Sequence, residues 1–444
     1  MKKWLRKVQD RVYFIPVSYA ALGFVLALVF IYVDIAQADR LQFLPGFMFT
    51  EVDLAESIFS SLVGALLTMI TVSFSTIMVV LTLYSGQFTP RITRDFLEGR
   101  VPLRILGAFM ATFIFCIVSL YALGAAEHDQ LLLSAAVGVI LAIGCLGLFG
   151  YFIHHVARSV QINYIIDRVN RDIMSSVEKH IEQIEASPFI RRHLEDVPEG
   201  ISEEALTEVT IDAPGFVQDI DYDALVAVAT EYNLVLYSRT RLGEYLEEDD
   251  VVVSVHSYSN HEPPAGDELA DTIRATISCG EERNTRQDVE FGIIKLVEIA
   301  LRAVSPGIND PNTAIYCISK LGPILRTIGR ELEILYYYDE DMVFRLQLQN
   351  LLFRELVYET YYQIRHYGRH DVSVLGALLD SVGDIADSDN GLATDHLWSL
   401  AEYLLEDLPP DTFAGMDVSF LNSKIRGLAR LLSTDPADLL IESG

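Results

Sequence analysis

The stretch SIFSSLVGALLTMITVSFSTIMVVLTL, residues 57–83, decides the class of fold. It contains no Asp, Glu, Lys or Arg, and it exceeds the roughly 20 apolar residues that cross a bilayer as a helix. In water such a helix would expose apolar side chains on every face. The sequence therefore predicts a membrane-spanning helix at this position.

Three further apolar stretches accompany it, so that the expected spans are Val12–Ala36, Ala55–Leu83, Val101–Gly124 and Leu131–His155. Each is long enough for a hydrocarbon core of about 30 Å. The first follows several basic residues but is too long for a signal peptide and has no small-residue cleavage site, which favours a retained helix. A hydrophobic fraction of 51% agrees with a membrane protein.

Charge divides the chain into two halves. Up to residue 158 there are 11 basic and 10 acidic residues, and the totals of 33 and 62 leave 22 basic and 52 acidic residues after it. The connection between the second and third spans carries four basic residues, Arg91, Arg94, Arg100 and Arg104. In the first and third connections, Arg40 is the only basic residue. Because basic loops stay in the cytoplasm, we expect both termini and the acidic half there, in a bacterial inner membrane. An acidic surface also disfavours nucleic acid as a partner.

Small polar residues follow one face of the second span. They are spaced by 4, 3, 4, 3, 4 and 7 residues, which is the spacing of a single helix face. We call this set the hydroxyl stripe: Ser57, Ser61, Gly64, Thr68, Thr71, Ser75 and Thr82. Two interpretations stay open, because small residues allow close helix packing and hydroxyl groups can also line an aqueous pore.

The acidic half begins with a connecting helix and linker and continues with a β-rich region. Short runs of β-branched and aromatic residues occur at Val209–Asp212, Phe216–Ile220, Leu234–Ser238 and Val251–Val255, with one helix before Tyr232. From Gly266 onward the apolar spacing predicts helices near 266–278, 287–304, 311–333, 341–367, 371–387, 391–406 and 417–433. The expected fold is a four-helix membrane domain with a cytosolic α+β region, in which a small β-barrel or sandwich precedes a helical domain. The expected boundaries are 1–12 for a basic N-terminus, 13–157, 158–205, 206–257 and 258–444.

The loop SPGINDPNTA, residues 305–314, separates two of the expected helices. Asp310 and Pro311 suit the N-cap and the first position of a helix. Ser305 is biased away from helical dihedral angles by the following proline. Gly307 permits a positive φ where the chain reverses, and Asn309 can satisfy backbone groups of the turn. A capped turn is therefore favoured over a ligand-binding loop.

Motifs for enzyme chemistry are missing from the sequence. There is no H-E-x-x-H, G-x-S-x-G or Walker loop, and the four cysteines have no C-x-x-C spacing. His366 and His370, four residues apart, are a weak zinc candidate, and a solvated helix end is the better interpretation. Arg286, Asp288 and Arg302 are expected, with Asp310, to form a buried ion-pair network. We therefore expect no catalytic residue, no metal and no cofactor.

Two segments resemble a known family. They are SFSTIMVVLTLYSGQFTPRITRDFLEG, residues 73–99, and NTRQDVEFGIIKLVEIALRAVSPGINDPNTA, residues 284–314. Both are similar to a family of predicted bacterial membrane proteins of unknown function, domain-of-unknown-function family twenty-two fifty-four. Gly86 stands where that family more often has serine. The resemblance implies the architecture of spans and cytosolic region but no activity and no catalytic residues.

Three functions stay open at this point. The first is a homo-oligomeric, cation-leaning channel in the lipid bilayer, with the second span lining the path. The second is a membrane-anchored sensor or scaffold whose cytosolic modules bind a protein partner or a small ligand. The third is a membrane enzyme that uses the histidine pair and acidic residues. The sequence favours the channel, because a hydroxyl stripe with no charged residue between Ile58 and Phe88 suits passive conduction.

Overall fold

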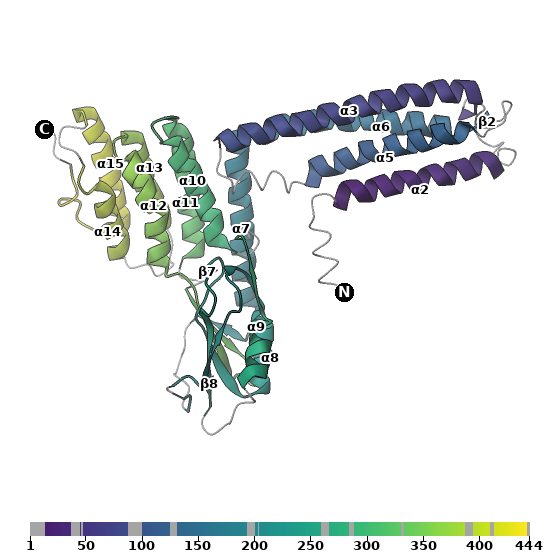
Figure 1. Ribbon diagram of the computed structural model, residues 1–444. Helices are drawn as coiled ribbons and strands as arrows, with labels where there is room; N and C mark the ends of the chain where they lie inside the picture. The colour runs from purple at the N-terminus through teal and green to yellow at the C-terminus, as the bar shows by residue number, and fades with distance from the viewer. Residues whose placement is uncertain are drawn as a thin grey trace. The chain divides into compact units, whose positions relative to one another are not determined.

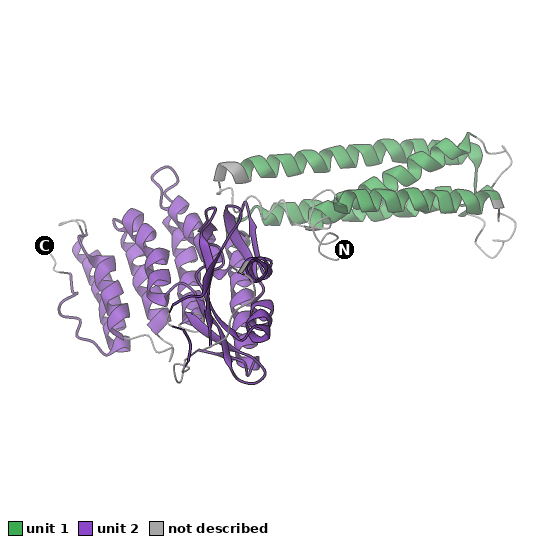
Figure 2. Ribbon diagram, turned by 60° about the horizontal axis from the view of Figure 1, so that its bottom comes forward, with its two compact units in different colours: residues 1–164 green, residues 165–444 purple. Residues whose placement is uncertain are grey.

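The computed structural model describes residues 14–36, 45, 48–87, 100–124, 131–192, 200–202, 204–258, 266–283, 288–329, 333–386, 394–408 and 413–441. They form two compact units, residues 1–164 and 165–444 (Figure 2). The basic N-terminus, residues 1–12, lies outside the described residues, as do Arg91 and Arg94 of the second connection.

Unit 1 contains four long apolar helices, which confirms the predicted spans (Figure 1). They are α2 (Phe14–Ala36), α3 (Val52–Gln87), α5 (Arg100–Leu123) and α6 (Ser134–Ser159). The short strands β1 (Thr50–Glu51) and β2 (Leu131–Leu132) pair just before α3 and α6. Helices are expected here because the bilayer offers no hydrogen-bond partner to the backbone.

The four helices pack through aromatic rings and small residues. Phe115 meets Phe30 and Phe59 edge-on, at 6.1 and 6.3 Å between ring centroids. Gly23 brings α2 against the backbone of α5, where any side chain would overlap that backbone. The buried Asp34, near the end of α2, accepts a hydrogen bond of 2.8 Å from the backbone N–H of Leu133. The ends of α2 and α6 are thereby joined.

Unit 2 contains the β-rich region that the sequence predicts. Its strands are β3 (Ile190–Arg191), β4 (Thr207–Thr210), β5 (Gly215–Ile220), β6 (Leu234–Ser238), β7 (Tyr245–Leu246), β8 (Val251–Ser257), β9 (Ile277–Gly280), β10 (Ile334–Tyr338) and β11 (Phe344–Gln349). Six of them form one sheet in the order β3-β10-β11-β6-β8-β4, and three form a second sheet in the order β7-β5-β9. Helices α8 (Tyr222–Glu231) and α9 (Gly266–Arg274) pack on these strands.

The region expected as a small β-barrel or sandwich is β-rich, but neither of its two sheets is closed among the described residues, so a barrel is not shown. The prediction that the chain is helical from Gly266 onward is wrong, because β9, β10 and β11 lie there. The segment ILYYY alternates between buried and less buried residues, and FRLQLQ does so from Leu346 onward, which is strand periodicity. The larger sheet therefore takes strands from both sides of the expected boundary at residue 258.

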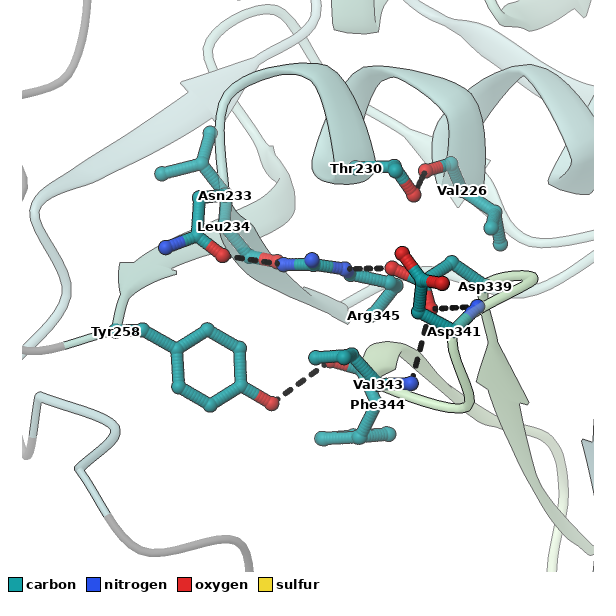
Figure 3. A network of polar contacts seen from close by, with 10 residues as sticks. All are labelled: Val226, Thr230, Asn233, Leu234, Tyr258, Asp339, Asp341, Val343, Phe344 and Arg345. Atoms are coloured by element: carbon teal, nitrogen blue, oxygen red, sulfur yellow. Dashed lines mark hydrogen bonds and ion pairs between the residues drawn. The ribbon is translucent and has the colours of Figure 1, made fainter.

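A buried ion pair holds the late hairpin β10–β11 on the early strand β6 (Figure 3). Arg345 of β11 donates to Asp339 at 2.7 Å and to Asn233, beside β6, at 2.9 Å. Asp339 also accepts from the backbone N–H groups of Asp341 and Val343 in the hairpin turn. Every group of this network is satisfied, which is the condition for burying charge without a large penalty.

The remaining helices of unit 2 stack as three antiparallel pairs that lie side by side (Figure 1). The pairs are α10 (Val289–Ala303) with α11 (Pro311–Ile328), α12 (Phe353–Gly368) with α13 (Val372–Ala386), and α14 (Thr394–Leu405) with α15 (Gly415–Leu432). Helix α7 (Ile162–Ala186) lies against the first pair, where Ile173 meets Gly292. The Tyr316 hydroxyl donates to Asp167 at 2.6 Å and fixes α7 on α11.

Candidate functional site

The hydroxyl stripe of α3 is exposed along its whole length in the single chain. All of its members are exposed, and Gly64 has no other group within 4 Å of the place where a side chain would begin. From Ser57 to Thr82 the stripe extends for roughly 38 Å at 1.5 Å per residue. That length exceeds a hydrocarbon core of about 30 Å. The stripe is therefore long enough to cross the full thickness of a bilayer.

The stripe lies on the opposite side of α3 from the packed face. At about 100° per residue, its members fall within an arc of roughly 80°. The buried residues of α3 within the stripe's length centre on the other side of the helix, and they are Phe59, Leu66, Ser73 and Val80. Large exposed residues such as Leu67 and Val72 flank the stripe. The other three helices of unit 1 therefore do not cover it.

Four hydroxyl groups of the stripe, those of Ser61, Thr68, Thr71 and Thr82, bond to their own helix. Ser61, Thr68 and Thr82 each donate to the backbone carbonyl four residues earlier, at 2.9 Å. This bonding satisfies the donor and leaves an oxygen lone pair available. Helix α6 also has a small-residue face that is open, because a side chain added at Gly144, Gly147 or Gly150 would meet nothing within 4 Å.

The loop after α10 is a tightly bonded turn. Asp310 is the N-cap of α11, where its carboxylate accepts from the Thr313 backbone N–H at 3.2 Å and from the Thr313 hydroxyl at 2.6 Å. Pro311 is the first helical residue. The Ser305 hydroxyl donates to the carbonyl of Arg302, and the Ser305 carbonyl accepts from the N–H of Asn309. The side chains of Ser305 and Asp310 are therefore both bonded within the turn.

The left-handed residue of this loop is not the predicted one. Gly307 does not have a positive φ, whereas Asn309 has a φ of 51°. Asparagine tolerates this conformation better than other residues with a side chain. The prediction for Gly307 is therefore wrong, and the chain reverses at Asn309 instead.

Asp288 forms a buried ion pair with Arg283, a residue that the expected network did not include. Asp288 caps α10 by accepting from the Phe291 N–H, and it receives two hydrogen bonds from Arg283, at 2.6 and 2.8 Å. Arg286, another member of the expected network, lies outside the described residues, so its part in the network stays a prediction. Arg302 lies at the other end of α10, in its last turn. The backbone of Gly243, at a φ of 80°, rests directly on the Arg283–Asp288 pair.

The histidine pair is not on one helix face. Helix α12 ends at Gly368, so His366 lies in its last turn and His370 lies beyond it. Both are exposed, and the ring of His366 contacts Tyr367. Within the described ranges, no group of three or more His, Cys, Asp or Glu side chains is arranged to hold a metal ion.

A cavity of about 110 Å³ lies inside unit 2 and was not predicted. Its wall comes from α7, α8, the turn before β7, the first turn of α10, the end of α11, β10, β11 and α12. Most of this wall is apolar, including Leu335, Leu348 and Phe353. A mostly apolar cavity with a few polar groups is the usual form of a small-ligand site.

The polar groups of the cavity are electrostatically unusual. Burial raises the pKa of Glu290, and the positive charges of Arg283 and Arg241 oppose that rise. Burial also raises the pKa of the Tyr222 and Tyr337 hydroxyls, whose rings lie 5.7 Å apart between centroids. Shifted carboxyl groups in cavities are frequent at functional sites.

No sequence signal pointed to this cavity, because its residues are scattered from His180 to Leu356. Of these residues, the sequence patterns single out only Asp288, as part of an ion pair. Of the two strands that complete the wall, β11 lies inside the predicted helix 341–367, and β10 lies in the gap between this helix and the one predicted at 311–333. A search for strand periodicity in residues 334–349 would have placed them in the sheet, although not beside α10.

Comparison with known proteins gives a family and several relatives. A family model described as "Predicted membrane protein (DUF2254)" matches residues 9–384. The chain is similar to uncharacterized proteins of Mycobacterium bovis and Mycobacterium tuberculosis, at 28% identity over 333 residues. The match covers 73% of this chain and 62% of each relative, so the chain spans less than two thirds of their length. No solved structure matches the chain.

Proposed function

We propose a function from the premise that this chain belongs to the DUF2254 family of predicted membrane proteins: it forms a homo-oligomeric channel of the bacterial inner membrane, lined by α3. The observation that carries this proposal is the position of the hydroxyl stripe, exposed and opposite the packed face of its helix. Contact with lipid does not stabilise such a polar face, whereas contact with water or with a neighbouring subunit does.

A ring of subunits would place each stripe residue once per subunit around a common axis. The hydroxyl oxygens, already bonded to their own helix as donors, would offer lone pairs to a passing cation. The open glycines of α6 would allow a neighbouring helix to approach closely. The acidic half, on the cytoplasmic side with both termini, would raise the local cation concentration. The proposal assigns no catalysis to the chain.

The experiment compares Thr68→Leu with Thr76→Leu in liposomes. Thr68 is in the stripe, while Thr76 is about 100° around the helix from the stripe's centre and bonds to its own helix in the same way. The two variants therefore make the same side-chain change on different faces. Oligomer size is measured first, and cation flux second.

An intact Thr68→Leu oligomer that loses flux, beside a Thr76→Leu oligomer that conducts, supports the channel. Loss of assembly in Thr68→Leu alone would instead assign the stripe to subunit packing. Equal flux from intact wild type and Thr68→Leu, or no flux from either, contradicts the channel proposal.

A second candidate function is favoured by the cavity of unit 2. In this case the protein is a membrane-anchored sensor whose cytosolic unit binds a small ligand. His180, which contributes to the cavity wall, is on α7, and α7 follows the fourth span after a break of two residues. Ligand-dependent thermal stabilisation of the full chain tests this function independently of flux.

A further inference from the structure

Of the charged side chains that line the cavity of unit 2, Arg241 and Glu290 carry opposite charges and are not bonded to each other. By contrast, Asp288 is bonded to Arg283, and Glu333 accepts from the Phe353 N–H. The Arg241 side chain has no hydrogen bond or ion pair with any described residue, yet its charge acts on Glu290. Glu290 is 19% exposed, and its closest cation is Arg283, at 3.4 Å. Arg283 in turn gives its two shorter bonds, at 2.6 and 2.8 Å, to Asp288. A guanidinium and a carboxylate are therefore left incompletely paired in one partly enclosed space.

The rest of the cavity is suited to an aliphatic group. Its apolar wall includes Val289, Leu335 and Leu348, and Val289 is half-buried beside Glu290. A volume of about 110 Å³ is somewhat smaller than the roughly 150 Å³ of a cavity that admits benzene. One branched aliphatic side chain is thus the size of group that fits.

We propose that this cavity binds a small zwitterion with an aliphatic body, such as an apolar α-amino acid, with its carboxylate on Arg241 and its ammonium group on Glu290. This inference rests on the second candidate function and does not depend on conduction by α3. A simple carboxylic acid would place its anion beside Glu290, and a simple amine would place its cation beside Arg241. Only a ligand that carries both charges complements both groups.

The choice of Arg241 for the carboxylate follows from its geometry. A guanidinium binds a carboxylate through two parallel N–H bonds, which fixes the orientation of the ligand. Loss of either head group from the ligand removes one of the two charged contacts and leaves its protein partner unmatched in the cavity. Binding should therefore weaken by about tenfold or more.

The test uses the full chain in detergent and isothermal titration calorimetry with three probes that share an isobutyl group. They are leucine, 4-methylpentanoate, which lacks the ammonium group, and 3-methylbutylamine, which lacks the carboxylate. Leucine is expected to bind at least tenfold more tightly than either of the others. This comparison needs no variant and is independent of any folding defect.

Three variants then locate the site. Arg241→Gln should reduce leucine affinity to that of the amine, and Glu290→Gln should reduce it to that of the carboxylate. Val289→Phe should fill the cavity and abolish binding. Arg239→Gln is the matched control, because the Arg239 side chain bonds to Ser254 and is not part of the cavity wall.

The outcomes separate this inference from the function on which it rests. Equal or tighter binding of 4-methylpentanoate or of 3-methylbutylamine overturns the zwitterion but leaves a ligand-binding sensor standing. Leucine binding that persists unchanged in Val289→Phe and Arg241→Gln places the site elsewhere and also overturns the inference. No binding of any probe at millimolar concentration contradicts both the zwitterion and the use of this cavity.

Discussion

The hydroxyl groups of α3 in unit 1 and the buried charged groups of unit 2 have opposite roles in the fold. In unit 1 the hydroxyls of α3 bond within one turn of their own helix, as Ser61 does to Ser57. In unit 2 the key polar bonds join residues far apart in the chain, as Arg345 does to Asn233 across 112 positions. The hydroxyls of α3 therefore leave the fold of the membrane unit almost unaffected, whereas the polar bonds of unit 2 hold its fold together.

The surroundings of each unit explain this difference. A helix in lipid must pair its backbone N–H and C=O groups with each other. Its backbone hydrogen bonds are therefore complete before it packs against a neighbouring helix. A strand in water leaves half of its backbone groups unpaired until another strand arrives. Substitutions can test the contrast, beginning with the buried charge that should matter most.

Asp339→Ala should produce the largest effect. It leaves Arg345, which is 7% exposed, without its buried partner and removes the acceptor for two backbone amides. Breaking a buried pair in this way typically costs about 3–5 kcal/mol. The measurement is a urea titration of the full chain, followed by Trp398 fluorescence in a Trp4→Phe background. Lys424→Ala, which breaks an exposed pair with Asp380, should cost less than about 1 kcal/mol.

The same pair predicts a pH dependence. Burial alone would raise the pKa of Asp339, but Arg345 and two backbone amides lower it below its usual value. Because the folded pKa is lowered, this stabilisation is present above the unfolded pKa of about 4 and is lost as the pH falls through the folded value. Wild type should therefore lose more stability on acidification than Asp339→Asn. Identical acid profiles would contradict this role.

Gly243→Ala should have the next largest effect. Gly243 has a φ of 80°, and a side chain there would overlap Asp288 and Arg283. The backbone strain is about 1–2 kcal/mol and the overlap adds roughly 1–3 kcal/mol. The matched control is Gly307→Ala, which meets nothing within 4 Å and should change stability by less than about 0.5 kcal/mol. A similar loss in the two variants would show that Gly243 is not a special position.

Asp310→Ala should cost about 1 kcal/mol, because it removes the cap of α11. Asp310→Asn keeps an oxygen for the Thr313 N–H and should cost only about a few tenths of a kcal/mol. Denaturant midpoints of the two variants provide the comparison. If asparagine were as damaging as alanine, the negative charge rather than the cap would be what the loop requires.

Thr71→Val should have the smallest effect. The Thr71 hydroxyl is exposed and bonds to the carbonyl of Leu67 at 2.9 Å. Valine keeps the shape and removes only this local bond, so stability should change by less than about 0.6 kcal/mol. Thermal unfolding in detergent measures this change in stability. A loss as large as that in Asp339→Ala would remove the contrast between the two units.

The candidate sites differ in the same way, because some depend on local bonds and others on contacts between distant residues. The hydroxyl stripe and the Asp310 cap were predictable because spacing and local backbone chemistry define them. Arg283 as a partner of Asp288 was not predicted, and the left-handed residue of the loop is Asn309 rather than Gly307, since several nearby residues could serve and only packing selects among them. The cavity gave no signal, because it joins the first turn of α10 to strands that follow it by some 45 residues.

The sequence by itself determined the four membrane helices, the polar face of α3, the early strands and most helix boundaries of unit 2. These features follow from local periodicity and backbone hydrogen bonding, which a short window of residues specifies. Only the tertiary structure decided that residues 334–349 are strands, that β11 lies parallel to β6, and that Arg241 and Glu290 line one cavity. Those outcomes depend on which distant surfaces meet, and burial against a partner outweighs local propensity when the two disagree.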